Sequence, residues 1–223
     1  MKILNILLIY WLFQPFEREI QTAVDELRPS KDLVLHIKNT SNTEGSEALA
    51  VVFPELIRWS AMSDLFETSA NELLYVQGGR SVADFSIGHF QMKPSFIEDL
   101  EAYITTHPAL STFNYVVINK KSDKDNRSER IQRLKQLAWQ LRYAHVYWLV
   151  AQDKFKHRTF ATAKDRIRFF ATAYNYGFTK PESDIETWQK RKAFPFGTKY
   201  KGEQASFSDF AIAFYEKYAP EFE

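Results

Sequence analysis

Hydrophobic residues recur along most of the chain at the three- and four-residue spacing of an amphipathic helix. The first pattern runs from Phe16 to Leu27 and stops before Pro29, and the second runs from Leu49 to Leu56. Each predicts a helix with one buried face. Further helical patterns lie at residues 65–74, 96–104, 131–148, 167–174 and 207–215.

Polar residues and glycines separate these segments. The run from Lys38 to Ser46 predicts a loop, and the longest apolar stripe, over residues 131–148, predicts a central core helix. Alternating strand patterns are scarce. We therefore predict a mainly α fold, a single helical domain over residues 16–223, with a small loop or β element near residues 75–92.

Composition narrows the class of protein only a little. The chain has 223 residues and a formal net charge of +1, so charge requires no nucleic-acid, membrane or acidic partner. Basic residues between Lys120 and Arg168 alternate with aromatic residues, but the aromatics share an apolar stripe, which favours a core helix with a solvated basic face.

Cysteine and histidine usage excludes other kinds of site. The absence of cysteine rules out disulfides, a thiol nucleophile and a cysteine zinc site. The five histidines lack the spacing of metal ligands, so we expect neither a metal nor a cofactor; they are His36, His89, His107, His145 and His157. His145 lies on the apolar stripe and is expected to be a hydrogen-bonded core residue.

The N-terminus carries an apolar run from Ile3 to Phe13 after Lys2, which matches the core of a signal peptide and is too short to span a membrane. No small-residue cleavage site follows Phe13. We expect residues 1–15 to be a signal or anchor segment and the protein to be exported to the periplasm or cell envelope, with an ordinary buried helix as the alternative.

Three segments combine chemistry with unusual neighbours. Residues 86–94 form a compact loop with glycine, glutamine and histidine before a helix, and residues 173–177 end a helix at Gly177. Glu55 is a carboxylate among apolar neighbours, directly after Pro54, which removes one helical hydrogen bond. Taken singly, each has an ordinary structural explanation. Residues 86–94 could be a turn before a helix, the aromatics of residues 173–177 could pack in the core, and Glu55 could be a solvated surface glutamate.

In this order, however, the segments resemble the signature motifs of the lysozyme-like lytic transglycosylases. Gly-His-Phe-Gln-Met-Lys-Pro at residues 88–94 resembles the family's Gly-Leu-Met-Gln-Ile-Met-Pro, and Ala-Tyr-Asn-Tyr-Gly at residues 173–177 resembles Ala-Tyr-Asn-Ala-Gly. Glu55 matches the catalytic glutamate upstream, although Leu56 stands where the family has serine. The resemblance covers about residues 45–180 and implies a lysozyme-like domain of the soluble-transglycosylase or goose-type kind.

The resemblance also implies a reaction. Glu55 would act as general acid and then base, cleaving the β-1,4 bond between muramic acid and glucosamine in peptidoglycan strands and leaving 1,6-anhydro-muropeptides. It implies substrate-binding or supporting roles for Ser86, Gly88, Phe90, Gln91, Met92, Tyr174 and Asn175. An acid must be protonated near neutral pH, so we expect apolar burial to raise the pKa of Glu55; the candidate wall residues are Phe53, Leu56 and Trp59.

Two other functions remain open at this point. A hydrolytic muramidase would use a second carboxylate, for which Asp64 and Asp84 are the nearest choices. A lysozyme-like protein that binds glycan or an envelope partner without cleavage would need no acid. Glu67 and Glu72 are rivals of Glu55 for the catalytic role.

Overall fold

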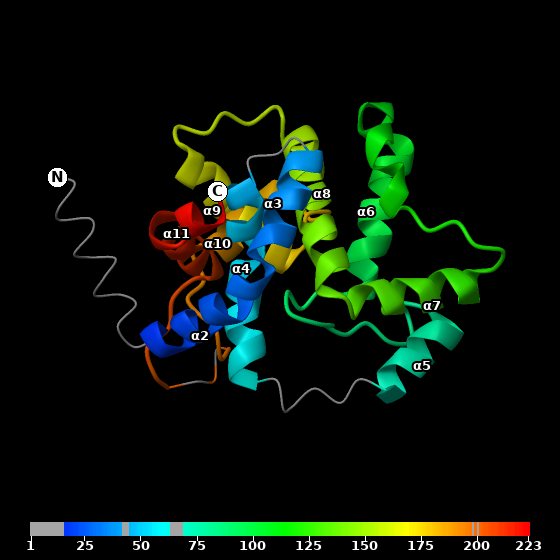
Figure 1. The fold of residues 1–223 in the computed structure, drawn as a ribbon, viewed down its shortest axis with the longest axis horizontal. Helices are drawn as coiled ribbons and strands as arrows, with labels where there is room; N and C mark the ends of the chain where they lie inside the picture. Colours follow the sequence, from blue (N-terminus) through cyan, green and yellow to red (C-terminus); the bar gives the residue numbers. More distant parts are fainter. Residues whose placement is uncertain (1–15, 42–44, 63–68, 198, 200) are drawn as a thin grey trace.

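The structure is a computed structural model that describes residues 16–41, 45–62, 69–197, 199 and 201–223, and almost all of its regular structure is helical (Figure 1). The prediction of a mainly α fold is confirmed. The α-helices are α2 (Glu17–Leu27), α3 (Lys31–Ser41), α4 (Gly45–Met62), α5 (Ser69–Gly78), α6 (Pro94–Thr106), α7 (Asp123–Leu134), α8 (Leu137–Lys154), α9 (Ala163–Tyr176), α10 (Glu182–Gln189) and α11 (Phe207–Lys217). The 3-10 helices are η2 (Arg28–Ser30), η4 (Pro108–Val116) and η5 (Ala219–Phe222).

The β pairing in the described ranges consists of two isolated bridges. Ile87 pairs with Met92, within the region predicted for a small β element. Phe194 pairs with Ala205, which the prediction did not foresee. The second bridge joins single residues eleven positions apart, and the residues before Phe194 do not alternate polar and apolar residues as a strand would.

Helix α4 is the centre of the core. Its segment from Leu49 to Phe53 has no exposed surface, because α2, α3, α8, α9 and α11 all pack against it. A helix surrounded in this way has no polar face, which is why Glu55 on its third turn is buried. The prediction that residues 131–148 form the central helix is therefore wrong.

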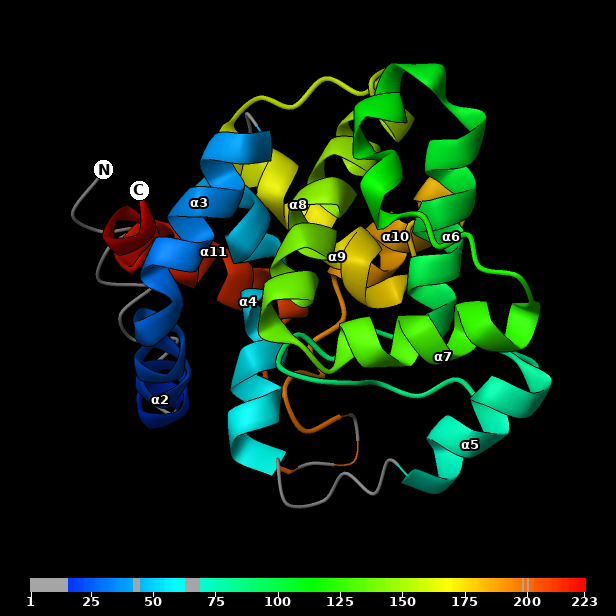
Figure 2. The ribbon, with the colours of Figure 1, turned by 45° about the vertical axis from the view of Figure 1, so that its right-hand side comes forward.

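The same residues also form two helices instead of one. α7 ends at Leu134, Gln136 adopts an extended conformation, and α8 starts at Leu137 in a different direction (Figure 2). The side-chain amide of Gln140 donates to the carbonyl oxygen of Leu134, which stabilises the end of α7. The apolar stripe continues across this break because Ile131 and Leu134 of α7 and Leu141 of α8 are all buried.

The predicted loop at residues 38–46 is also largely helical. α3 extends to Ser41 and α4 begins at Gly45, while residues 42–44 lie outside the described part of the chain. Val34 and Ile37 bury one face of α3, and this packing carries the helix into its polar end. Helices α3 and α10 were not predicted.

Helix ends follow the local sequence closely. Thr162 caps α9 by accepting a hydrogen bond from the amide of Asp165 at 3.1 Å, and Gly177 ends it with φ = 125°. Ser206 and Asp209 form a reciprocal capping box at the start of α11. These short signals explain why the predicted helices near residues 167–174 and 207–215 are confirmed.

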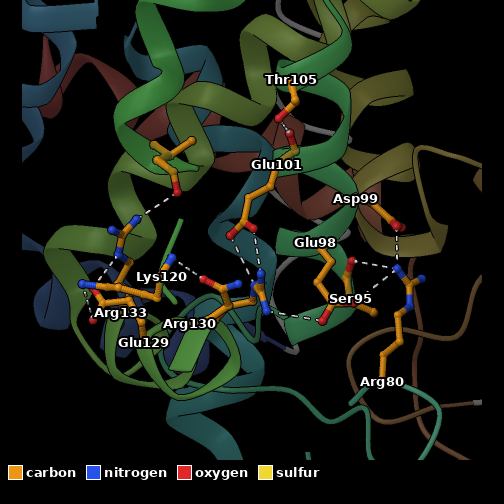
Figure 3. Close-up of polar contacts among 12 residues, drawn as sticks. Arg80, Ser95, Glu98, Asp99, Glu101, Thr105, Lys120, Glu129, Arg130 and Arg133 are labelled. Carbon is orange, nitrogen blue, oxygen red and sulfur yellow. Dashed lines mark hydrogen bonds and ion pairs between the residues drawn. The ribbon is translucent and has the colours of Figure 1, made fainter. Parts of the chain in front are cut away.

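A buried network of ion pairs and hydrogen bonds joins α5, α6 and α7, and Figure 3 shows its contacts between α6 and α7. Arg130 of α7 donates to both carboxylate oxygens of Glu101, at 3.2 and 2.7 Å, and to the hydroxyl of Tyr75 at 2.6 Å. It also lies 3.3 Å from Glu98. The expectation that basic residues of this segment form a solvated face is wrong for Arg130, because carboxylates on α6 provide its partners.

The aromatic residues between positions 120 and 168 belong to the core, as predicted. Tyr143, Tyr147 and Trp148 are buried, and so is His145, whose Nδ1 lies 2.9 Å from the carbonyl oxygen of Leu141. The predicted leader at residues 1–15 lies outside the described residues. Within them, no helix is both long and apolar enough to cross a membrane.

Candidate active site

Three segments that are distant in sequence meet at the carboxyl group of Glu55. Glu55 projects from α4, and the Asn175 side-chain nitrogen at the end of α9 donates to its Oε1 at 3.2 Å. The neighbouring Tyr174 hydroxyl donates to the carbonyl oxygen of Phe90 in the 86–94 loop, at 2.6 Å. These two bonds bring together the segments that the sequence analysis singled out.

Burial controls the protonation of Glu55. Only 4% of the residue is exposed, and removal from water penalises its charged form, so its pKa is raised. The positive charge of Arg58, the hydrogen bond from Asn175 and the charge of Lys93 oppose this shift without reversing it. A raised pKa is the property that a general acid needs near neutral pH.

The two oxygens of Glu55 differ in their surroundings. Oε1 accepts the bond from Asn175 and a long one, 3.5 Å, from Arg58. Oε2 lies 3.1 Å from the Arg58 guanidinium, outside hydrogen-bonding geometry, and it is buried with no hydrogen-bond partner among the described residues. One oxygen therefore fixes the orientation of the carboxyl group, and the other is available to carry a proton.

Asn175 is itself held in place. Its side-chain oxygen accepts a hydrogen bond from the indole nitrogen of Trp188 at 2.9 Å, and the ring of Trp188 stacks on Tyr176. Because the oxygen is occupied by a donor, the amide nitrogen must face Glu55. Helix α10, which carries Trp188, thus sets the direction of the bond to the candidate acid.

Tyr174 supports the site through the loop. Its ring packs edge-on against Phe96 and beside Tyr147. The negative charge of Glu55 disfavours ionisation of the Tyr174 hydroxyl. Burial, and then Glu55, raise the pKa of Tyr174 far above its ordinary value, so its hydroxyl stays protonated as a donor. Its hydrogen bond goes to Phe90, and Asn175 makes the bond to Glu55.

The 86–94 loop is built by its own glycine and glutamine. Gly88 has φ = 69°, and Gln91, with φ = 47°, donates from its backbone at 3.0 Å and its side chain at 2.8 Å to the carbonyl oxygen of Gly88. Phe90 and Met92 are buried. Gln91 thus braces the turn, while Phe90 and Met92 anchor it in the core.

The identity of Gly88 has a steric reason. A Cβ atom here would overlap the side-chain amide of Gln140 and lie 2.9 Å from the carbonyl oxygen of Leu134. Gln140 is buried and also bonds the backbone of Phe90 and Ile87, at 2.7 and 3.1 Å. The glycine therefore lets the loop dock at the junction between α7 and α8.

Other predicted residues lie near the site with different partners. Ser86 is half-buried, and none of the hydrogen bonds among the described residues joins it to Glu55. Trp59 lies against His89, with ring centroids 5.5 Å apart, and burial lowers the pKa of His89, which keeps it neutral. Phe53 stacks on Phe214 of α11, so it belongs to the core between two helices.

The rival carboxylates have other roles where they are described. Glu72 on α5 forms an ion pair with Lys135 at 2.7 Å. Asp84 accepts hydrogen bonds from the amide and hydroxyl of Ser95, at 3.2 and 2.9 Å, and so stabilises the first turn of α6. Asp64 and Glu67 lie outside the described residues.

Three contributors to the site were not predicted. Arg58 and Trp188 act directly on Glu55 and Asn175, and Gln140 holds the loop. Arg58 could have been found, because it stands one helical turn after Glu55. Nothing local marks Trp188 or Gln140, whose partners lie on other elements.

Comparisons of the chain with models of known protein families, with curated proteins and with solved structures find no match.

Proposed function

We propose that the protein is a peptidoglycan lytic transglycosylase that cleaves the β-1,4 bond between muramic acid and glucosamine. The observation that carries this proposal is the carboxyl group of Glu55. It is buried and oriented through Oε1 by Asn175, and its Oε2 is ion-paired with Arg58 but accepts no hydrogen bond from the described residues, beside the other two motif-like segments. The resemblance of those segments to the transglycosylase motifs supplies the substrate class.

The reaction needs one acid that later serves as a base. Protonated Glu55 transfers its proton from Oε2 to the leaving glycosidic oxygen as the bond to the anomeric carbon breaks. The resulting carboxylate then accepts the proton of the muramic acid C6 hydroxyl, whose oxygen attacks the anomeric carbon. The products are a new glycan end and a 1,6-anhydro sugar, and no water is consumed.

The neighbours of Glu55 suit both halves of this cycle. Burial favours the neutral acid before cleavage, and Arg58, Lys93 and Asn175 stabilise the carboxylate after it. The mechanism requires no second carboxylate, and Asp84 is occupied in capping α6. These contacts make Asp84 a poor second carboxylate for a hydrolytic route.

The direct test is digestion of purified sacculi followed by mass spectrometry of the soluble products. We expect anhydro-muropeptides, which are lighter by one water than hydrolytic products. The Glu55→Gln variant should release none, and Glu72→Gln, a change of the same size at a rival glutamate, should act like the unchanged protein.

Other outcomes would contradict the proposal. Products with only reducing ends would make the protein a hydrolytic muramidase. Binding to sacculi without release of muropeptides would make it a glycan-binding envelope protein. The proposal also places the protein in the periplasm or cell envelope, where its substrate lies, and fractionation of cells that express it would check this.

A further inference from the structure

A cavity of about 250 Å³ lies beside the candidate acid. Residues from α4, α9, α10, the segment after α10 and the start of α11 form its wall, and Arg58, Asn175, Trp188, Arg191 and Phe194 are among them. Arg58 and Asn175 are also the two residues that contact the carboxyl group of Glu55. The cavity is therefore separated from the acid by a single layer of side chains.

The charge of this wall is positive. Among the described residues that line it there are two arginines and no aspartate or glutamate. Arg191 is exposed, and its guanidinium lies 4.4 Å from the ring centroid of Trp188, with no ion pair to a carboxylate among the described residues. Arg58 is paired with Glu55, through a 3.5 Å hydrogen bond to Oε1 and a 3.1 Å ion pair with Oε2, so Arg191 is the wall arginine whose charge no carboxylate among the described residues balances.

Aromatic rings hold both guanidinium groups in position. Arg58 lies 5.0 Å from the centroid of Phe194, and Arg191 lies over Trp188, which is fixed by its bond to Asn175 and by stacking on Tyr176. Guanidinium groups that are oriented in advance lose less entropy when they bind a carboxylate. The cavity thus combines positive charge, oriented donors and apolar walls.

We propose that this cavity is a subsite for a carboxylate of the peptide attached to muramic acid, bound between Arg58 and Arg191. The inference rests on the proposed function, because it assumes that the glycan lies at Glu55. Peptidoglycan differs from uncharged β-1,4 glycans such as chitin in carrying carboxylate-bearing peptides beside the cleaved bond. A paired-arginine subsite next to the acid would select for that feature.

A binding measurement tests the subsite without requiring catalysis. The probe is an N-acetylmuramyl dipeptide with a free terminal carboxylate, titrated into the full chain and followed through the indole N–H resonance of Trp188. We expect that resonance to shift. The same probe with its terminal carboxylate amidated should bind about tenfold more weakly, which is the loss of one charge-assisted hydrogen bond.

Two matched variants test whether Arg191 binds the terminal carboxylate of the probe. Arg191→Gln should weaken the acid probe about tenfold and leave the amidated probe unchanged. Lys192→Gln removes the same charge at the next position, which is exposed and does not line the cavity, and should change neither probe. Equal binding of both probes, or equal binding of inorganic phosphate, would overturn the assignment to a peptide carboxylate.

Digestion of peptidoglycan with and without its peptides tests the subsite independently of the transglycosylase reaction. Arg191→Gln should slow cleavage of intact peptidoglycan and leave cleavage of glycan strands stripped of their peptides unchanged. Equal slowing on both substrates would overturn the subsite while leaving the transglycosylase proposal intact. Tight binding of the acid probe by a protein that never cleaves peptidoglycan would overturn only the proposed function.

Discussion

Glu55 and Glu101 are two buried glutamates with an arginine beside each, yet their surroundings differ. Both are less than a tenth exposed, and burial raises the pKa of both against the opposing charge of the arginine. Arg130 meets Glu101 with two hydrogen bonds, one to each oxygen. Arg58 meets Glu55 obliquely and leaves Oε2 without a hydrogen bond.

The difference separates the structural role of Glu101 from the chemical role proposed for Glu55. Arg130 and Glu101 form two hydrogen bonds, and Arg130 is also paired with Glu98 (Figure 3). Arg130 donates a further hydrogen bond to Tyr75, so both oxygens of Glu101 and the guanidinium are occupied by protein partners. At Glu55, Asn175 orients one oxygen, and the other is ion-paired with Arg58 but accepts no hydrogen bond from the described residues. Burial and a raised pKa are shared by both sites, so hydrogen-bond saturation is the property that distinguishes them.

The largest effect is expected for Glu55→Gln. The amide cannot donate a proton as an acid, so the rate of muropeptide release should fall by about 10³-fold or more, within the range for loss of general acid catalysis. Mass spectrometry of digested sacculi measures this. Release at an unchanged rate would remove Glu55 from the mechanism.

The free energy of unfolding shows whether Glu55→Gln loses activity without losing its fold. Because the pKa of Glu55 is raised in the folded state, the folded protein holds a proton that the unfolded chain has released, and the free energy of unfolding falls as the pH rises through the raised pKa. Glu55→Gln removes this dependence. Its free energy of unfolding at neutral pH should equal or exceed that of the unchanged protein in urea denaturation.

Glu101→Gln should have the opposite profile. Removing the carboxylate leaves the buried charge of Arg130 without its main partner, which should lower the free energy of unfolding by about 3 kcal/mol. Urea denaturation measures this. The control Glu186→Gln breaks an exposed pair with Arg158 and should cost less than about 1 kcal/mol. A selective loss of cleavage in folded Glu101→Gln would show that the distinction between the two glutamates is wrong.

Gly88→Ala tests how the 86–94 loop packs on the junction between α7 and α8. The new Cβ would press on Gln140 and on the carbonyl oxygen of Leu134 at a left-handed φ, so we expect a loss of about 2 kcal/mol in thermal denaturation. Gly197→Ala is the matched control, because its φ is 83° and nothing lies within 4 Å of a Cβ there. It should lose only about 1 kcal/mol from backbone strain. Equal losses would refute the docking of Gly88 on Gln140.

The smallest effect is expected for Asn175→Ala. Without its hydrogen bond, Glu55 loses orientation, and the maximal cleavage rate should fall about tenfold. The bond also favours the carboxylate, so its loss raises the pKa of Glu55 further, and the high-pH limb of the rate profile should move to higher pH. Trp188→Phe keeps the stacking ring and removes only the donor to Asn175, so it should show the same shift more weakly. An unmoved limb in both variants would remove Asn175 from the control of Glu55.

Local sequence was sufficient for the helices whose ends and faces it encodes. The apolar spacing and caps around α9 and α11, and Pro94 at the start of α6, identified those helices because capping and amphipathicity act within a few residues. The motif order likewise pointed to Glu55, Tyr174 and the 86–94 loop. The structure brings these residues together at one place.

Tertiary packing decided the features that depend on contacts between distant parts of the chain. The break between α7 and α8 depends on Gln140 bonding residues of a loop about fifty positions earlier, and the burial of Arg130 depends on carboxylates on α6. The protonation of Glu55 depends on burial among five other helices and on partners such as Asn175. The sequence by itself thus determined the helices with strong local signals and the side chains that the proposed chemistry would use. Only the tertiary structure decided which carboxylate is saturated and which is available, because hydrogen bonds and desolvation arise between elements that the chain brings together only on folding.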